Sequence, residues 1–393
     1  MKEQMTPTKE PEIDATAGKN AEPRRLLFLD GMRGVAAIYV VCSHLIPAAG
    51  ARLPDDLRFL TNWANFGHYG VGVFIVLSGF VLMMPVAATT SVTMPGGWLS
   101  YFKRRARRLL PPYYAALALC VAFSVFGQHG GGFITLINHI RDGALVPFIV
   151  LVNNLIAPPA GFQSSSILWS VATEWQIYIL FPVLLLPTLR VAGPLGMVIA
   201  GFAVGCFPLT FQNHFGAYPG LFALGCIAAL TVGGHGRYAA LRVRVPWGTL
   251  ASAMIAIWLA VCFAGGQKWY VMDPLLGLTT AVCIIWLAGH SHSGHAGKPD
   301  LIRQVLEARP VLLLGTISYS LYITHMILGV KALWFLKTHT FQGLAPLAIT
   351  WVAVIPAIIM FAIVFHIIFE RPFLPAHYRQ LQRELLTSTP KAA

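Results

Sequence analysis

The sequence is poor in charged residues. Only 11% of its 393 residues are Asp, Glu, Lys or Arg, whereas about a quarter of the residues of an ordinary soluble domain are charged. Hydrophobic residues make up 56% of the chain, and the mean hydropathy is +0.66. These proportions exclude a disordered protein, a coiled coil and an ordinary soluble enzyme. They predict one polytopic membrane domain that is polar only at its ends and loops.

Cysteine is scarce, and its placement excludes two further classes of protein. No two of the six cysteines form a CxxC pair, so neither a disulfide framework nor a zinc site is indicated. All six lie inside apolar segments, at Cys42, Cys120, Cys206, Cys226, Cys262 and Cys283.

Long apolar stretches fill the chain between two polar ends. A membrane-spanning helix needs roughly 20 mostly apolar residues. We therefore predict an all-α, polytopic bundle of about ten transmembrane helices within residues 24–373. Residues 1–23 are predicted to be a disordered cytoplasmic tail, and residues 374–393 a second cytoplasmic tail. The predicted spans are 29–49, 70–88, 109–127, 168–187, 192–210, 217–233, 247–265, 271–289, 311–330 and 345–369.

Lysine and arginine are distributed unevenly between the two sides that these spans create. With the N-terminus in the cytoplasm, 21 of the 28 Lys and Arg residues fall inside and six outside, and Arg33 lies within a span. This excess follows the positive-inside rule and places both termini in the cytoplasm. The formal net charge of +13 is then mostly a topology signal, and we predict no nucleic-acid partner.

The apolar segment 144–157 is too short for an eleventh span. It contains Pro147, Asn153 and Asn154, and its length suits a re-entrant or interfacial segment. Counting it as a span would also move the arginines of 237–244 outside and reduce the charge asymmetry.

The first predicted span carries two ionisable residues. Such residues cost roughly 2.5–3.5 kcal/mol at the centre of a membrane helix, so they are candidates for function. Arg33 and His44 are eleven residues apart, which is about three turns, so both point to one face about 16 Å apart. They would line one path through the bundle. A snorkelling arginine and a histidine that bridges two helices would give the same pattern.

Five cations stand within six residues just before the third predicted span. Guanidinium groups match phosphate oxygens, so Arg104, Arg105 and Arg108 are candidate ligands for the phosphates of a nucleotide-like cofactor. A cytoplasmic anchor that binds anionic lipid is the alternative for the 103–108 cluster.

Two more ionisable groups lie at membrane depth, and both need a polar surrounding. Glu174 shares a helix face with Tyr178 at the start of the fourth span, and His325 lies about ten residues into the ninth. A polar cavity that holds them suits either catalysis or proton-coupled transport. The histidines of 290–295 lie in a Gly/Ser-rich loop without a carboxylate or cysteine partner, so we predict no metal.

Six sequence blocks carry a further signal, and together they extend over nearly the whole membrane domain. They are 25–37 with His44, 70–80, 105–108, 169–182, 318–325 and 370–373. Their content and order resemble the acyltransferase-3 family of integral membrane O-acyltransferases. The chain departs from the family pattern at two places. Only Glu174 remains where the family often has two adjacent acids, and Thr324 and Met326 flank His325 where aromatic residues are common.

The resemblance implies an enzyme that moves an acyl group, commonly acetyl, from cytoplasmic acyl-CoA to a hydroxyl of a sugar-containing acceptor. Cell-surface polysaccharides, lipopolysaccharide and glycosylated metabolites are acceptors in the family, which implies a bacterial inner membrane. A transporter or flippase of a glycan or lipid-linked substrate is the alternative, although we find no internal repeat of the kind that transporters show.

The resemblance also implies roles for the candidate residues. Arg105 and Arg108 would hold the phosphates of acyl-CoA, and Arg33 would guide its pantetheine arm. His44 would be the general base on the acceptor hydroxyl or a transient acyl carrier. Glu174 and His325 would orient the acceptor or stabilise charge.

Overall fold

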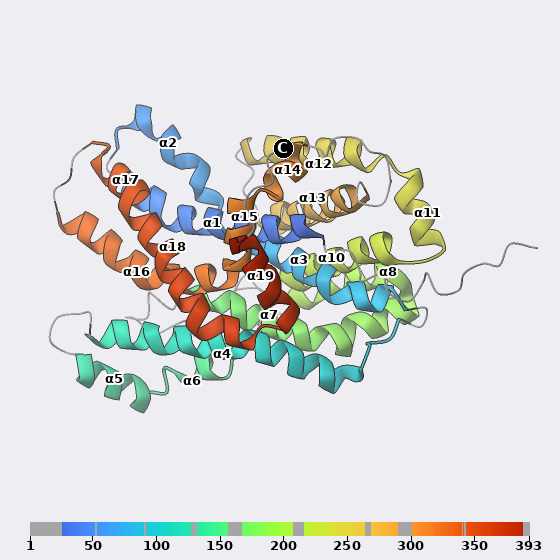
Figure 1. Ribbon diagram of the computed structural model, residues 1–393, viewed down its shortest axis with the longest axis horizontal. Coiled ribbons are helices and arrows are strands. Elements are labelled where there is room, and N and C mark those ends of the chain that lie inside the picture. The colour runs from blue at the N-terminus through green and yellow to red at the C-terminus, as the bar shows by residue number, and fades with distance from the viewer. Residues whose placement is uncertain are drawn as a thin grey trace, which may run out of the picture.

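The computed structural model describes residues 26–51, 53–89, 92–126, 132–155, 167–206, 216–263, 269–289, 301–339, 341 and 343–387. Within these ranges the regular structure is helical and no strand is present, so the predicted all-α class is confirmed (Figure 1). The helices are α1 (Leu27–Ala49), α2 (Phe59–Asn62), α3 (His68–Ala87), α4 (Gly97–Phe126), α5 (Gly132–Arg141), α6 (Val146–Ile149), α7 (Trp169–Leu180), α8 (Leu186–Ala203), α10 (Tyr218–Gly233), α11 (Arg237–Arg244), α12 (Trp247–Phe263), α13 (Trp269–Gly289), α14 (Leu301–Leu306), α15 (Arg309–Thr316), α16 (Ser318–Thr338), α17 (Ala345–Ile349), α18 (Ile355–Phe365) and α19 (Ala376–Thr387).

Six described helical stretches are long and apolar enough to cross a membrane. The number of candidate spans rises to seven if α10 and Tyr238–Arg244, which meet at a bend of 84°, are taken together as one span. The predicted multi-pass bundle is therefore confirmed, but the predicted count of ten is not. The six stretches are Leu27–Ala49, Phe59–Ala87, Trp169–Ala203, Tyr270–Gly289, Ser318–Thr338 and Ala345–Phe373.

The helices differ from the predicted spans at three places. The predicted spans 168–187 and 192–210 share one helical stretch, Trp169–Ala203, which is kinked at Gly193, where φ is 72°. The described part of the predicted span 109–127 belongs to the second half of α4, a 30-residue helix whose first half carries the arginines. Finally, α12 has 17 residues, which is short for a span.

The segment predicted to be re-entrant forms no spanning helix in its described part, residues 144–155. It contains the single turn α6 and then irregular backbone, in which Leu151 has a φ of 55°. Side chains of neighbouring helices satisfy its carbonyl groups: Tyr113 donates to Phe148 O at 2.8 Å, and Gln176 donates to Leu151 O at 2.8 Å. Non-helical backbone at membrane depth requires such partners.

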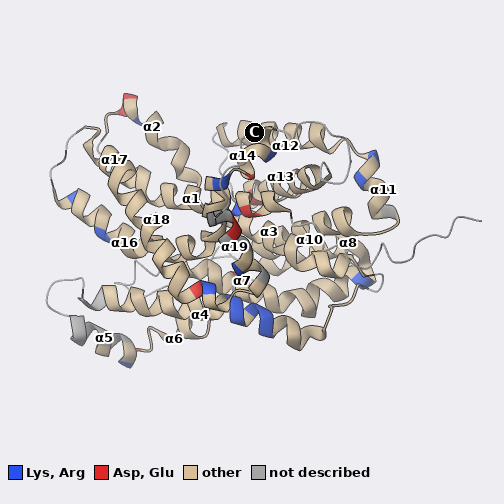
Figure 2. Ribbon diagram, viewed as in Figure 1, with Lys and Arg blue, Asp and Glu red and all other residues tan. Residues whose placement is uncertain are grey.

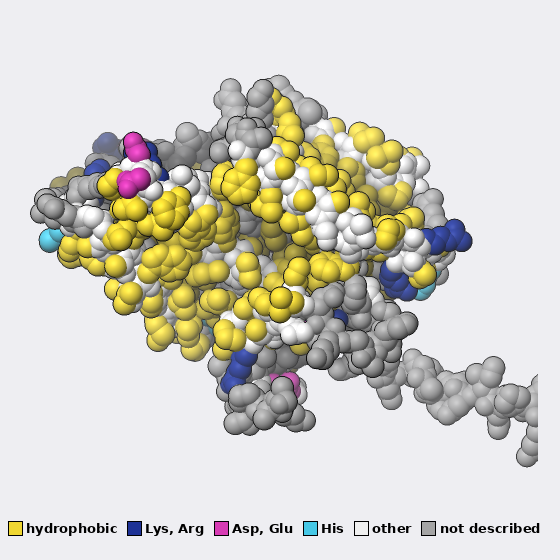
Figure 3. Space-filling view, turned by 90° about the horizontal axis from the view of Figure 1, so that it is seen from above, with side chains coloured by type: hydrophobic (Ala, Val, Ile, Leu, Met, Phe, Trp, Pro, Cys, Tyr) yellow, Lys and Arg dark blue, Asp and Glu magenta, His cyan; other side chains and the backbone are white. Residues whose placement is uncertain are grey.

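The outer surface agrees with a bundle that lies in lipid. Hydrophobic side chains cover the face shown in Figure 3, and the charged groups gather toward its edges. In Figure 2 most of the helical ribbon is uncharged, a run of Lys and Arg stands out on α4, and a smaller group of charged residues lies in the centre of the molecule beside α19. That central group marks the site described below.

Close contact between α1 and the α14–α15 segment fixes the start of α1. A Cβ on Gly315 would lie 2.1 Å from the carbonyl oxygen of Asp30, and one on Gly31 would lie 2.0 Å from Leu306 O. Only glycine allows two backbones to approach so closely, as at small-residue helix contacts in membranes. This packing holds Arg33 on a fixed part of α1, next to α15 and α16.

Helix α19 lies within the segment that the sequence analysis treats as a polar tail. It stands in the centre of the molecule between α18 and α7 (Figure 1), and its residues Tyr378 and Gln382 line a pocket with Arg33 and Arg108. The other predicted tail, residues 1–23, lies outside the described residues.

Candidate active site

A cavity in the middle of the bundle is lined by three arginines from two helices. Arg33 comes from α1, and Arg105 and Arg108 come from α4, where a spacing of three residues puts both on one face. The empty space at this site is about 840 Å³ when its open mouth is included. Glu174 of α7 is the only acidic residue of its lining, so positive charge predominates.

The arginine cluster of α4 divides between two faces of the helix. Arg104 and Arg107 are exposed, and Arg104 donates to Ser100 Oγ and to Pro95 O. The structure therefore places Arg104 outside the cavity that holds its predicted partners, Arg105 and Arg108. The buried Nε of Arg105 has no hydrogen-bond partner in the described part of the chain, which leaves a cationic donor available in the cavity wall.

Glu174 is held by two hydroxyl groups. Ser78 Oγ donates to Glu174 Oε1 at 3.0 Å, and Tyr178 Oη donates to the same oxygen at 2.5 Å. The two hydroxyl oxygens, Ser78 Oγ and Tyr178 Oη, are themselves 3.1 Å apart. The carboxylate is thus oriented by neutral donors, and the arginines of the cavity supply the opposite charge.

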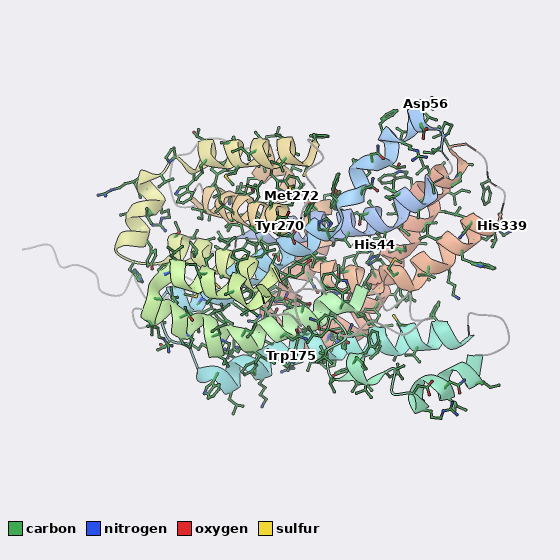
Figure 4. The ribbon with its side chains drawn as sticks, turned by 180° about the vertical axis from the view of Figure 1, so that it is seen from behind. His44, Asp56, Trp175, Tyr270, Met272 and His339 are labelled. Atoms are coloured by element: carbon green, nitrogen blue, oxygen red, sulfur yellow. The ribbon has the colours of Figure 1, made fainter. Side chains whose placement is uncertain are left out.

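The two candidate histidines meet although they are 281 residues apart in sequence. His44 Nδ1 of α1 lies 3.3 Å from His325 Nε2 of α16, and the ring centroids are 5.1 Å apart. His325 is fully buried, whereas His44 is exposed on its other side. In Figure 4, His44 lies farther into the molecule than Asp56 and His339, which are at the end toward which α1 runs.

Backbone carbonyls define the protonation of this pair, because a carbonyl oxygen can only accept. His325 Nδ1 is 2.6 Å from Tyr322 O and therefore carries a hydrogen. His44 Nδ1 is 2.9 Å from Val40 O and carries one too. In the neutral pair, the single Nδ1 hydrogen of His44 is shared between Val40 O, which is nearer, and His325 Nε2, and the free lone pair of His44 falls on Nε2. A proton taken at that nitrogen gives an imidazolium whose Nδ1–H is still shared between this carbonyl and His325.

Tyr322 connects the arginine cavity with the histidine pair. Its side chain lines the cavity, and its ring centroid is 5.9 Å from that of His325, one turn further along α16. Arg33, Arg105, Arg108 and Glu174 line the same cavity as Tyr322, whereas His44 and His325 lie beyond it. Six of the seven predicted residues therefore form two groups that adjoin at Tyr322, and Arg104 belongs to neither.

A second buried polar chain, which the sequence analysis did not find, joins α16 to α19. Ser320 Oγ donates to Glu370 Oε2 at 2.5 Å, His366 Nδ1 lies 2.7 Å from the same oxygen, and Gln382 Nε2 lies 3.0 Å from His366 Nε2. Glu370 lines a pocket beside the arginine cavity. Ser320 and Glu370 stand in two of the sequence blocks, but nothing in the pattern indicates that they touch.

Helix α19 also reaches Arg108. The guanidinium carbon of Arg108 lies 5.8 Å from the ring centroid of Tyr378, which is the geometry of a cation–π contact. The sequence signal for this helix is the mixture of polar and apolar residues over 376–387. That pattern alone did not distinguish a helix from a polar tail.

The described residues contain no group of three or more His, Cys, Asp or Glu side chains that could hold a metal ion. The histidines of 290–295 lie outside those residues.

The fold and the site define a multi-pass integral membrane protein with a cationic central cavity. The model of the acyltransferase-3 family, described as an acyltransferase domain, matches residues 26–371, so the chain belongs to that family.

Relatives with curated names cover the chain to different extents. O-acetyltransferase OatA of Staphylococcus aureus (strain MRSA252) is 24% identical over 403 residues, which is 94% of this chain and 62% of the relative. Peptidoglycan O-acetyltransferase OatA of Listeria monocytogenes is 29% identical over 174 residues, which is 41% of this chain and 24% of the relative. The chain thus spans less than two thirds of the length of these proteins. No solved structure matches it.

Proposed function

We propose that the protein is a membrane O-acyltransferase that moves an acetyl group from acetyl-CoA to a hydroxyl of a carbohydrate acceptor. The observation that carries the proposal is the junction at Tyr322 between an arginine-lined cavity and a pair of histidines. One part suits a donor with phosphate groups, and the other suits the deprotonation of an acceptor hydroxyl. Membership of the acyltransferase-3 family supports the same reaction.

Acetyl-CoA enters from the cytoplasm in this proposal. The distribution of Lys and Arg favours a cytoplasmic position for the start of α4, which carries Arg105 and Arg108. These two side chains and Arg33 would bind phosphate oxygens through charge-assisted hydrogen bonds, and the unpaired Nε of Arg105 adds a donor. The apolar wall of the cavity, including Val71 and Ile75, would contact the pantetheine arm.

The chemical step uses His44 as general base. His44 Nε2 takes the proton of the acceptor hydroxyl while the hydroxyl oxygen attacks the thioester carbonyl carbon. The carbon–sulfur bond then breaks, and the imidazolium returns the proton to the departing thiolate, which gives the ester and free CoA. Neutral His325 and Val40 O share the His44 Nδ1–H throughout, so together they stabilise the imidazolium and keep the ring oriented.

The acceptor in this proposal is a glycan of the cell envelope, with peptidoglycan as the first candidate. The similarity to peptidoglycan O-acetyltransferase OatA supports this choice. The protein would then reside in a bacterial plasma membrane with both termini in the cytoplasm.

The test is acceptor-dependent release of CoA by membranes or purified protein supplied with labelled acetyl-CoA and peptidoglycan fragments. In wild-type protein we expect labelled ester on the glycan. Replacing both Arg105 and Arg108 with Ala should raise the KM for acetyl-CoA by about tenfold or more, because each charge-assisted bond contributes about 1.5–3 kcal/mol. The kcat should change much less.

The matched control removes the same charge from the exposed face of the same helix. The variant with Arg104→Ala and Arg107→Ala should keep its KM within about twofold, since neither side chain lines the cavity. Absence of CoA release from wild-type protein with every glycan acceptor would sink the proposed function and favour transport.

A further inference from the structure

The aromatic pair of Tyr322 and Phe74 occupies the junction between the cavity and the histidines. Both side chains line the cavity, Phe74 from α3 and Tyr322 from α16, and their ring centroids are 6.0 Å apart with an angle of 64° between the planes. Tyr322 is 8% exposed and fully buried His325 lies behind it. A group that moves from the cavity toward the histidine pair therefore meets these two rings.

Hydrogen bonds fix the Tyr322 ring in this place. Ser170 Oγ of α7 donates to Tyr322 Oη at 2.6 Å, and Tyr322 Oη donates to Ile167 O at 3.3 Å. The hydroxyl is thus anchored on α7, while the ring stands on α16 next to the histidine. Three helices, α3, α7 and α16, hold the rings of Tyr322 and Phe74 in place. The width of the junction is therefore set by the packing of these helices and not by one free side chain.

The chemistry of the donor makes the width of this junction important. The acyl carbonyl has to reach His44, so the acyl chain must occupy the space at the two rings. Steric selection of this kind is strong, because one methylene in a close-fitting apolar pocket changes kcat/KM by about 10-fold to 200-fold. Rings that close the junction would also limit the access of water to the thioester.

We propose that Tyr322 and Phe74 form an aromatic gate that selects short acyl chains and limits hydrolysis of the donor when no acceptor is bound. The inference rests on the proposed acyl transfer and adds the residues that determine acyl selectivity. The gate moves no proton and forms no bond with the substrate. Its role is to set the space through which the acyl group passes.

The experiment measures kcat/KM for acetyl-, butyryl- and hexanoyl-CoA, together with the release of CoA in the absence of acceptor. In Tyr322→Ala the ratio of butyryl to acetyl activity should rise at least tenfold, and acceptor-independent CoA release should rise several-fold. Phe74→Ala should shift both quantities in the same direction from a different helix. It serves as the test if Tyr322→Ala is not recovered as folded protein.

Two further variants separate the gate from general loosening. Tyr322→Phe keeps the ring and should keep the acyl-chain ratio within about twofold of wild type. Tyr319→Ala widens the same cavity from the same helix, but the hydroxyl of Tyr319 donates to Leu109 O on α4, away from the pair of Tyr322 and Phe74. Its acyl-chain ratio should therefore stay near that of wild type, whatever its overall rate.

The outcomes distinguish the gate from the reaction on which it rests. Unchanged ratios in both Tyr322→Ala and Phe74→Ala, with wild-type protein active on acetyl-CoA, would overturn the gate and leave the proposed function intact. An equal rise in Tyr319→Ala would overturn it too. Wild-type protein that releases no CoA with any donor would overturn the function and the gate together.

Discussion

His44 and His325 differ in their hydrogen bonds although they are residues of the same type. Both rings donate from Nδ1 to a backbone carbonyl, but only His44 directs its second nitrogen away from the pair. His325 is fully enclosed by protein, and its remaining lone pair faces His44. This arrangement suits the roles given to the two residues in the proposed mechanism, His44 as base and His325 as the group that orients it.

The role of His44 can be tested by His44→Gln, which keeps a hydrogen-bonding side chain but cannot take a proton at neutral pH. We expect kcat to fall by about 10²–10⁴-fold, since this is the usual worth of general base catalysis. The KM for acetyl-CoA should stay close to that of wild type, because Arg105 and Arg108 are unchanged. Steady-state kinetics on membranes with equal protein content measures both quantities.

A matched control for this substitution is His339→Gln. His339 is an exposed histidine near the end of the molecule toward which α1 runs (Figure 4), and it bonds the carbonyl of Phe335 on its own helix, as His44 bonds Val40. Its replacement should leave kcat unaltered. Full activity of His44→Gln would exclude His44 as the base, and Glu174 or His325 would then need the same test.

Sequence spacing predicted part of this site and missed its arrangement. The spacing of eleven positions from Arg33 to His44 indicated one path along α1, and the structure places Arg33 in the cavity and His44 beyond Tyr322. The contact of His44 with His325 depends on the packing of α1 on α16, which spacing within one helix does not report. The hydrogen bond between Glu370 and Ser320 was not predicted either, because it also depends on how separate helices pack.

At the scale of elements, the approach of α1 to α15 depends on small residues at the contact. Gly315→Ala would place a Cβ 2.1 Å from the carbonyl oxygen of Asp30, so two backbones would have to separate. We expect a loss of about 1–3 kcal/mol in stability, as for other overpacked sites. Thermal unfolding of detergent-solubilised protein should show a lower Tm.

The matched control for this substitution is Gly289→Ala at the end of α13. Nothing lies within 4 Å of a Cβ built there, and its φ is not positive. Its Tm should equal or slightly exceed that of wild type, because alanine is the better helix former. Equal Tm values for the two variants would show that the α1–α15 contact is more open than described.

Helices were predicted well where hydrophobicity determines where they form, and less well where packing determines it. The apolar runs of α1, α3, α13 and α16 indicated their helices because each is long enough to cross lipid. The arginines of α4 suggested a loop before a span, but the helix continues through them since Arg105 and Arg108 have a polar cavity to face. Helix α19 is polar, and only its docking on Arg108 and His366 distinguishes it from a tail.

At the scale of the whole molecule, the prediction concerns topology. The excess of Lys and Arg on one side indicates that both ends of the chain lie in the cytoplasm. Reporter fusions at residue 10 and residue 390 should therefore both give a cytoplasmic signal. Opposite signals from the two fusions would require an odd number of crossings and a different assignment of the segments around Gly193 and α12.

The pairing of the first helix with α15 and α16 has a consequence for biosynthesis. His44 is made 281 residues before its partner, and ribosomes add about 5–20 residues per second. Helix α1 must therefore wait about 15 to 60 seconds in the membrane before its glycine face packs on α14 and α15 and His44 meets His325. The rate at which this enzyme acquires its active centre is then limited by translation of the distal half of the message, and not by the speed at which its first helix inserts.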